Sequence, residues 1–309
     1  MFDLIGDIHG HADALVTLLG RLGYTRIGGV FRHADRKVVF LGDFIDRGPQ
    51  IREVLEIVRP MVEKGHALAI MGNHEFNALA YHTPHRDAPN SNGHGAFLRP
   101  RSAKNQKQHH ATLDQLTSEQ LRSYLSWFRT LPLWLELDGI RAVHACWDVE
   151  AMDRIVEAGV LRDGVSDDFL HDACCPEGPL IDAVEVLLKG KECRLPQGVV
   201  FQDKEGHSRT VMRTRWYENP SGHTYRTYAF QSAAIDCDLE LDRSVIAAAE
   251  PYPDRAKPVF IGHYWLSAQQ PSVLAPNVAC LDYSVAKGGF LCAYRWSGEN
   301  RLQDENFVW

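Results

Sequence analysis

Residues 37–48 read KVVFLGDFIDRG, and this stretch decides the fold. A short apolar strand over 37–41 is stopped by Gly42 and followed at once by charged side chains. The same unit, an apolar strand and then a glycine with polar residues, occurs at 2–5 and again at 67–71. This repetition predicts strands whose carboxyl ends all carry polar loops.

Helices are predicted between these strands. Apolar residues recur at helical spacing after His11 and again after Ile51, and Gly23 ends the first helix. Alternating strands and helices predict an α/β fold with a largely parallel inner sheet and helices outside. A further helix is predicted at 117–129 and further strands at 133–137, 140–144, 259–261, 278–283 and 290–296.

Three motifs rich in chemically active side chains follow the first three strands. They are GDIHG at 6–10, GDFIDRG at 42–48 and GNHE at 72–75. Ligands of open α/β sheets bind outside the carboxyl ends of the strands, so we expect the three motifs to meet in one crevice. Two histidines, His144 and His263, end predicted strands in the same way.

Carboxylates, imidazoles and an amide oxygen are the ligands that hard and borderline divalent cations prefer. Taken singly, each residue has an ordinary structural interpretation: an aspartate after a strand commonly forms a turn, and Asn73 could cap a helix. Taken together, the groups exceed what one ion needs, and a carboxylate that bridges two ions would explain the surplus. The mixed ligands suit Mn, Fe, Zn or Co, and we expect Mn.

The three motifs, in this order, resemble the signature of the calcineurin-like metallophosphoesterase superfamily. Within it, they are most similar to the phosphoprotein phosphatase branch, including bacterial serine/threonine phosphatases and dinucleoside polyphosphatases. The resemblance covers residues 1–80 and extends to His144 and His263. It implies a β-sandwich of mixed sheets flanked by helices, with an inserted α+β subdomain.

The resemblance also implies roles for individual residues. A first metal ion would be held by Asp7, His9 and Asp43, and Asp43 would bridge to a second. The second ion would be completed by Asn73, His144 and His263, and Asn73 would also face the substrate.

Catalytic and phosphate-binding roles follow from the same resemblance. Arg47 would clamp the phosphate, and His74, oriented by Asp46, would be the general acid. A second phosphate-binding arginine is expected from the inserted segment, with Arg213 and Arg215 as candidates.

The implied reaction is attack of a metal-bridging hydroxide on a phosphomonoester, either a phosphoprotein or a small phosphorylated metabolite. The alternative is hydrolysis of dinucleoside polyphosphates of the Ap4A type. A third hypothesis is a catalytically silent protein that keeps the metals. Gly262-His263-Tyr264-Trp265 lacks the second histidine of many superfamily members, and Asp46 and Glu75 also favour the protein-phosphatase style of site.

Composition sets limits on partners. A net charge of −7 and a pI of about 6.1 argue against a nucleic-acid polymer as partner. The chain has no long apolar span and no basic, apolar leader, so we expect a cytoplasmic protein that does not bind membranes. Seven irregularly spaced cysteines indicate neither a disulfide framework nor a zinc site. The sequence leaves the oligomeric state open.

The chain is predicted to be a single metallophosphoesterase domain, 1–309, with two insertions. Residues 83–110 form a polar loop or cap, and residues 150–255 form a subdomain with strands at 199–202, 210–215 and 225–231 and a helix near 179–188. Both insertions leave the core beside expected metal ligands. We therefore expect them to set substrate choice and to contribute little to the chemical step.

Overall fold

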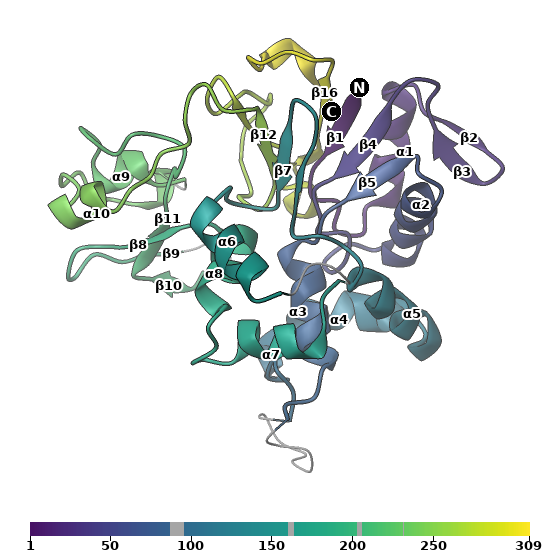
Figure 1. Ribbon diagram of the computed structural model, residues 1–309, viewed down its shortest axis with the longest axis horizontal. Helices are drawn as coiled ribbons and strands as arrows, with labels where there is room; N and C mark the ends of the chain where they lie inside the picture. Colours follow the sequence, from purple (N-terminus) through teal and green to yellow (C-terminus); the bar gives the residue numbers. More distant parts are fainter. Residues whose placement is uncertain (87–95, 160–163, 203–205, 231) are drawn as a thin grey trace. The chain divides into compact units, whose positions relative to one another are not determined.

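The structure is a computed structural model that describes residues 1–86, 96–159, 164–202, 206–230 and 232–309 (Figure 1). The chain forms two compact units: residues 1–188 together with 257–309, and residues 189–256. Parts of both predicted insertions, at 87–95, 160–163 and 203–205, and the last residue of a predicted strand at 231, lie outside the described residues.

A mixed five-stranded sheet carries the three motifs of the larger unit. Its parallel strands run in the order β1, β4, β5, and β16 and β17 extend it in antiparallel fashion beyond β1. The predicted parallel arrangement therefore holds for the three motif strands. The strands of this sheet are β1 (Phe2–Ile5), β4 (Lys37–Phe40), β5 (Ala67–Ala69), β16 (Ala293–Trp296) and β17 (Phe307–Val308).

A four-stranded sheet carries the two later histidines. Its order is β13, β12, β7, β6, with β12 parallel to both neighbours and β6 antiparallel to β7. All four strands were predicted from the sequence. The strands are β6 (Trp134–Glu136), β7 (Arg141–Val143), β12 (Val259–Ile261) and β13 (Val278–Cys280).

The two sheets enclose one hydrophobic core. Fully buried side chains from the five-stranded sheet, such as Leu4 and Tyr294, belong to the same cluster as Ala142 and Phe260 from the four-stranded sheet. The ring centroids of Phe260 and Tyr294 lie 5.1 Å apart across this core. The predicted sandwich of mixed sheets is thus confirmed, and burial of this apolar surface fixes the edges that carry the motifs.

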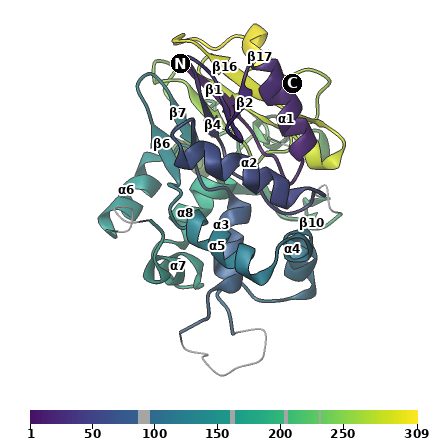
Figure 2. The same cartoon turned by 90° about the vertical axis from the view of Figure 1, so that its right-hand side faces the viewer.

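Helices flank the sheets. Figure 2 shows α1 and α2 beside the five-stranded sheet, with α3, α4 and α5 below α2 in that view. The helices over 51–63 and 118–128 match the predictions, but α4 was predicted as part of a loop. Its only buried side chains are those of His109 and Thr112, so it has no apolar stripe to identify it. These helices are α1 (Ala12–Arg21), α2 (Ile51–Glu63), α3 (Asn73–His82), α4 (Ala103–Gln115) and α5 (Ser118–Phe128).

Smaller elements complete this unit. The hairpin of β2 and β3 follows α1, and three helices follow the four-stranded sheet's β7. In the part of the chain that the structure describes, no helix combines the length and apolar character needed to cross a bilayer. These elements are β2 (Thr25–Ile27), β3 (Val30–Arg32), α6 (Val149–Glu157), α7 (Asp167–Cys174), α8 (Ile181–Lys189), β14 (Asp282–Tyr283), η2 (Val285–Lys287), β15 (Phe290–Leu291) and η3 (Asp304–Asn306).

The unit over 189–256 has its own small core, which includes Met212 and Tyr225. Two antiparallel pairs form it, β8 with β11 and β9 with β10, together with short helices. The strand predicted at 225–231 is wrong: its first residues form α9, because the Thr224 side chain accepts a hydrogen bond from the Thr227 amide and caps a helix. The elements are β8 (Glu192–Arg194), β9 (Phe201–Gln202), β10 (Ser208–Arg209), β11 (Val211–Arg213), α9 (Tyr225–Tyr228), η1 (Ser232–Ala234) and α10 (Arg243–Ala247).

A buried charge network ties the first strand to the chain's last segments. The carboxylate of Asp3 is fully buried and accepts hydrogen bonds from Arg36 at 2.9 Å, from Arg295 at 3.2 Å and from the Tyr24 hydroxyl at 3.0 Å. Arg36 also donates to the backbone carbonyls of Phe2 and Trp296. Removing the carboxylate would leave a buried guanidinium without its counterion.

We predict that Asp3→Ala lowers the free energy of unfolding by about 3–5 kcal/mol, the usual cost of breaking a buried ion pair. The matched control is Glu63→Ala, which removes an exposed partner of Arg59 and should cost less than about 1 kcal/mol. Denaturant unfolding of both variants makes the comparison. Equal, small losses would show that the Asp3 network does not hold the sheet together.

Candidate metal centre

The three motif loops meet at the carboxyl ends of β1, β4 and β5. Backbone bonds join the first two loops: the His9 amide donates to the Asp43 carbonyl at 2.8 Å, and the Gly10 amide donates to the Phe44 carbonyl at 2.9 Å. The neighbouring sheet brings His144 after β7 and His263 after β12 to the same place. The convergence expected from the sequence is therefore present.

The carboxylate of Asp43 lies at the middle of this group. Its Oδ2 atom is 3.5 Å from Nε2 of His9, 3.5 Å from Nε2 of His144 and 3.9 Å from Nε2 of His74. All four side chains are buried. Two triads with the spacing of metal ligands result, His9–Asp43–His74 and Asp7–Asp43–His144, and both contain Asp43.

The remaining expected ligands surround the second triad. The Asn73 side-chain oxygen is 3.1 Å from Nε2 of His144 and 2.8 Å from Nδ1 of His263. The carboxylate of Asp7 accepts the backbone amide of His263 at 3.1 Å. Every expected ligand thus contacts another member of the group. The triads place His74 rather than Asp7 beside His9 and Asp43, so the expected division of ligands between two ions stays a prediction.

Strained backbone concentrates at this centre. In the described part of the chain, seven non-glycine residues have positive φ, and five of them are His9, Asp43, Asp46, Arg47 and His263. Each such residue costs on the order of 1–3 kcal/mol, and such strain clusters at functional sites. The fold therefore maintains an unfavourable backbone geometry at the residues that form this centre.

Two glycines leave room for the ligand carboxylates. A Cβ atom at Gly72 would lie 2.2 Å from Oδ1 of Asp43, and one at Gly262 would lie 2.0 Å from Oδ1 of Asp7. Either contact is too short for any side chain. These close approaches explain why the glycines precede Asn73 and His263.

Glu75 fixes the loop that contains Asp43. Its side chain is fully buried, and its two oxygens accept the backbone amides of Asp43 and Phe44 at 2.8 Å each and of Gly72 at 3.0 Å. Asp43 in turn accepts the His74 amide at 2.9 Å. The second and third motifs are therefore held together by reciprocal carboxylate–amide bonds, which are among the stronger hydrogen bonds.

The buried charged side chains of this centre favour the binding of a cation. Burial and the neighbouring carboxylate of Asp282 raise the pKa of Asp7 well above 3.8. Burial acts to lower the pKa of His144, but the carboxylates of Asp43 and Asp7 outweigh it and raise this pKa to about 10. The negative pocket thus draws a proton onto His144. A divalent ion would displace that proton and take the imidazole as a ligand.

The imidazoles are oriented to serve as ligands through Nε2. Nδ1 of His9 contacts the Ile45 carbonyl at 2.9 Å, and Nδ1 of His144 contacts the Leu41 carbonyl at 2.7 Å. Metal-bound histidines commonly donate their other ring N–H in this way. Nε2 of His9 is buried and makes no hydrogen bond to any described residue. The residues present therefore fit a metal centre.

The expected acid, His74, is a member of the first triad, and the expected phosphate clamp, Arg47, follows Asp43 on the same loop. Nδ1 of His74 is 2.6 Å from Oδ2 of Asp46, and both side chains are buried. The guanidinium of Arg47 stacks over the ring of Trp265 at 4.1 Å from its centroid. A stacked guanidinium keeps a planar face fixed while its N–H groups remain able to bind an anion.

Comparison with known proteins decides the family. A family model described as calcineurin-like phosphoesterase matches residues 1–187, more than half of the chain. The chain belongs to the calcineurin-like phosphoesterase family. The resemblance inferred from the three motifs is thereby confirmed. Members of this family depend on two metal ions, which agrees with the paired triads of this phosphoesterase.

Curated relatives share only a short segment with this phosphoesterase. It is 46% identical over 74 residues to the asymmetrical bis(5'-nucleosyl)-tetraphosphatase PrpE of Halalkalibacterium halodurans, and 45% identical over 74 residues to that of Bacillus subtilis (strain 168). Each match covers 24% of this chain and 30% of the relative. The chain thus spans less than a third of the length of these relatives.

Solved structures of phosphatases align over most of the chain at low identity. A cold-active protein-tyrosine phosphatase of a Shewanella species is 18% identical, with 95% of this chain and 74% of that chain covered and a TM-score of 0.49. A protein serine/threonine phosphatase from Saccharomyces cerevisiae is 13% identical, with coverages of 99% and 78% and a TM-score of 0.48.

Sequence reasoning missed several residues around this centre. Asp282 is buried and accepts the backbone amides of Trp265 at 2.7 Å and Ser284 at 3.0 Å, which holds the loop after His263. The ring of Trp265 stacks against the guanidinium of Arg47, and Nζ of Lys287 lies 5.6 Å from the centroid of the same ring. Asp282 falls inside the strand predicted at 278–283, so no polar loop marked it as a site residue. Nothing local indicated the stacking of Trp265.

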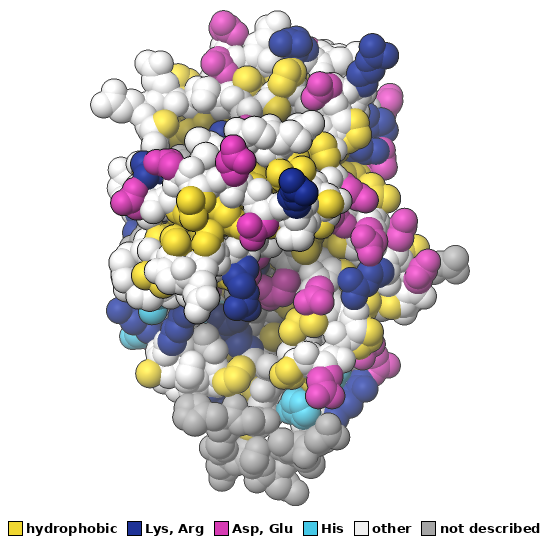
Figure 3. All heavy atoms as spheres, turned by 90° about the vertical axis from the view of Figure 1, so that its left-hand side faces the viewer, with side chains coloured by type: hydrophobic (Ala, Val, Ile, Leu, Met, Phe, Trp, Pro, Cys, Tyr) yellow, Lys and Arg dark blue, Asp and Glu magenta, His cyan; other side chains and the backbone are white. Residues whose placement is uncertain are grey.

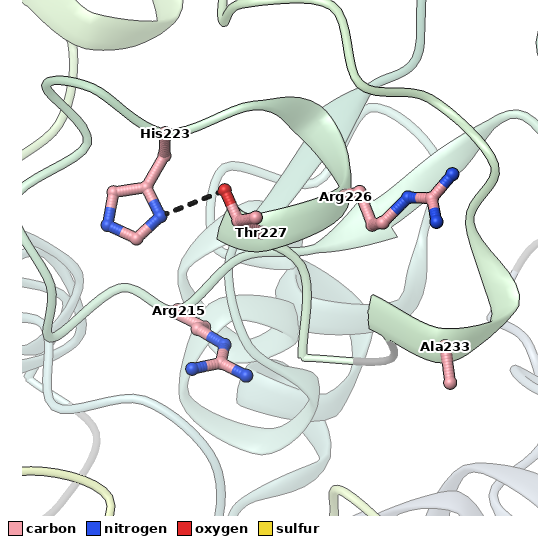
Figure 4. Close-up of a pocket in the computed structure, with 5 residues that line it drawn as sticks. All are labelled: Arg215, His223, Arg226, Thr227 and Ala233. Atoms are coloured by element: carbon pink, nitrogen blue, oxygen red, sulfur yellow. Dashed lines mark hydrogen bonds between the residues drawn. The ribbon is translucent and has the colours of Figure 1, made fainter.

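The candidate arginines of the insertion lie in the unit over 189–256. Arg213 pairs with Glu192, and Arg215 contacts Glu218 at 3.2 Å and the Ala229 carbonyl at 3.3 Å. Arg215 lines a cavity of about 460 Å³ with four other residues of this unit, drawn in Figure 4. There the guanidinium of Arg226 extends away from that of Arg215, and it pairs with Asp236 and Asp238.

Surface charge on one face of this phosphoesterase is mixed. Figure 3 shows Lys and Arg side chains interspersed with Asp and Glu, with hydrophobic side chains scattered among them.

We predict that Glu75→Gln destabilises the protein, because an amide group would turn an N–H₂ toward backbone amides that now donate to the carboxylate. Each buried donor left without an acceptor should cost roughly 1–3 kcal/mol. Glu157→Gln, at an exposed position in α6, should change stability by less than about 0.5 kcal/mol. Matching unfolding curves for the two variants would rule out the proposed role of Glu75.

Proposed function

We propose that this phosphoesterase hydrolyses phosphomonoesters, on a phosphoprotein or a small phosphorylated metabolite. The observation that carries the proposal is the buried Asp46–His74 pair, whose histidine belongs to one of the two triads that share Asp43. An acid held in this way is of most use when the leaving oxygen is strongly basic. An alkoxide leaving from a phosphomonoester is such a group.

The proposed metal ligands are Asp7, His9, Asp43, Asn73, His144 and His263, with Asp43 bridging two ions and Mn the expected metal. When bound, two such ions activate water at neutral pH and stabilise the attacking and leaving oxygens of an in-line displacement. Asp282 accepts a hydrogen bond from the backbone amide of Trp265 and neighbours Asp7, and it would support this set of ligands.

The chain's own residues would then position the phosphate and supply a proton. Arg47, held by Trp265, would bind the phosphate oxygens through its planar guanidinium. His74 would donate the proton on Nε2 to the leaving oxygen, because its Nδ1 is engaged by Asp46. Asp46 would stabilise the imidazolium before transfer, as its own pKa stays well below 3.8: burial opposes this, but the bonds from His109 and His74 outweigh burial.

Hydrolysis of dinucleoside polyphosphates is the second candidate, and the names of the curated relatives favour it. Here the leaving group is a nucleotide phosphate, whose second pKa is about 6, so the acid would matter less. Base stacking needs exposed aromatic rings, but Tyr225 and Tyr228 are buried in the core of their own unit and do not support this candidate. The hydrogen-bonded Asp46–His74 pair and the stacked guanidinium of Arg47 argue against a silent binding protein, which would need neither an acid nor a phosphate clamp.

A substrate panel with added Mn²⁺ tests the proposal. Phosphopeptides, sugar phosphates, a dinucleoside tetraphosphate and a phosphodiester would be compared by kcat/KM. The proposal expects a phosphomonoester to be the best substrate. A clear preference for the dinucleoside tetraphosphate would replace it with the second candidate, and no turnover of any substrate would favour the silent protein. Arg213→Ala and Arg215→Ala in the same panel would show which arginine serves as the second phosphate clamp.

We predict that Arg47→Ala and His74→Ala keep their metal but lose turnover. Removing the arginine should lower kcat roughly 10²–10³-fold, as for other positioned electrostatic groups. Removing the histidine should lower kcat roughly 10²–10⁴-fold on a substrate with a poor leaving group. Steady-state kinetics with metal analysis makes the measurement, and Arg32→Ala, at an exposed position, is the control. Near-normal hydrolysis of an alkyl phosphate by His74→Ala would contradict the acid role.

A further inference from the structure

Two side chains of α4 are directed at the carboxylate of Asp46. Nδ1 of His109 lies 2.8 Å from Oδ1 of Asp46, and the Thr112 hydroxyl donates to the same oxygen at 2.5 Å. His109 and Thr112 are the buried residues of α4, at 5% and 0% exposure. The two side chains that α4 buries are therefore the ones that bond to Asp46, the partner of the proposed acid His74.

Thr112 holds the backbone of Asp46 as well as its side chain. The Asp46 amide donates to the Thr112 hydroxyl oxygen at 3.0 Å, while that hydroxyl donates to the Asp46 carboxylate. Asp46 has a φ of +66°, which is unfavourable for a residue with a side chain. The hydroxyl thus stabilises a strained residue at both of its polar ends, and valine at this position would remove both bonds without changing the shape of the side chain.

A second histidine contacts the far side of the His109 ring. Nε2 of His82 lies 3.3 Å from Nε2 of His109, and burial, His109 and Arg101 lower the pKa of His82 to about 4. The donor at the other end of this ring follows from the contact with Asp46. An ionised carboxylate can only accept hydrogen bonds, so Nδ1 of His109 donates to Asp46. The partners form a line: His82, His109, Asp46, His74.

We propose that His109 and Thr112 are positioning residues of the hydrolytic reaction, which hold the Asp46 carboxylate so that His74 presents its proton to the leaving oxygen. The inference rests on the proposed acid role of His74. It also departs from the expectation that residues 83–110 contribute little to the chemical step, because His109 belongs to that segment.

The test uses a leaving-group series, from 4-nitrophenyl phosphate through phenyl phosphate to an alkyl phosphate, with Mn²⁺ present throughout. Loss of such supporting residues typically costs about 10–100-fold in activity. We expect His109→Ala and Thr112→Val to lose about that much kcat on the alkyl ester, less than about 3-fold on the nitrophenyl ester, and little in KM. His109→Asn and Thr112→Ser, which keep a donor, should recover most of the rate.

A double-mutant cycle separates positioning from structural damage. In a His74→Ala background, adding His109→Ala should cost no further rate on the alkyl ester, because the acid it serves is already gone. His110→Ala is the matched control, since this neighbour is exposed and pairs with Asp114 on the outside of α4. It should behave like the wild type across the series.

Four results would overturn the proposal. Equal losses by His109→Ala on all esters, or a further loss in the His74→Ala background, would show a structural role only. A wild-type rate for both His109→Ala and Thr112→Val on the alkyl ester would show that neither residue is needed. If His74→Ala itself showed no dependence on the leaving group, the proposed acid role would fail instead, and this inference with it.

Discussion

Burial of the Asp43 carboxylate is the constraint on which the centre depends. This side chain lies among imidazoles and near two other buried carboxylates, Asp7 and Asp282. Burial acts to raise the pKa of Asp43, but His144 and His74 outweigh it and hold this pKa well below 3.8. A buried anion of this kind is stable only with cationic or hydrogen-bonding partners on every side, and the surrounding chain supplies them.

The rest of the larger unit can be understood as support for that group. The sandwich core fixes the strand ends, the glycines before Asn73 and His263 allow close approach, and Glu75 joins the second motif loop to the third. Five residues of the centre keep unfavourable positive φ angles because these contacts and hydrogen bonds hold their loops in place. His74, the proposed acid, lies one residue beyond the proposed ligand Asn73, so both proposed roles fall in one turn at the start of α3.

The sequence predicted correctly those features that depend on residues close together in the chain. An apolar strand that ends in glycine and a polar residue is visible within about ten residues, so the motif strands and the convergence of their loops were predicted correctly. Partners from distant segments have no such signal. His109 and Thr112 meet Asp46 from more than 60 positions away, on a helix without an apolar stripe. The helix at Tyr225–Tyr228 was mistaken for a strand because its tyrosines favour strands, whereas the threonine cap before it decides the structure.

The central claim is that two ions share the carboxylate of Asp43, and metal stoichiometry tests it most directly. The protein would be reconstituted with Mn²⁺, freed of excess metal, and analysed for bound Mn per chain, beside Asp43→Asn and the exposed control Asp35→Asn. The account predicts about two Mn per chain in the wild type and the control, as in other two-metal phosphoesterases, and about one or fewer in Asp43→Asn. Undiminished binding of two ions by Asp43→Asn, or a single ion in the wild type, would contradict it.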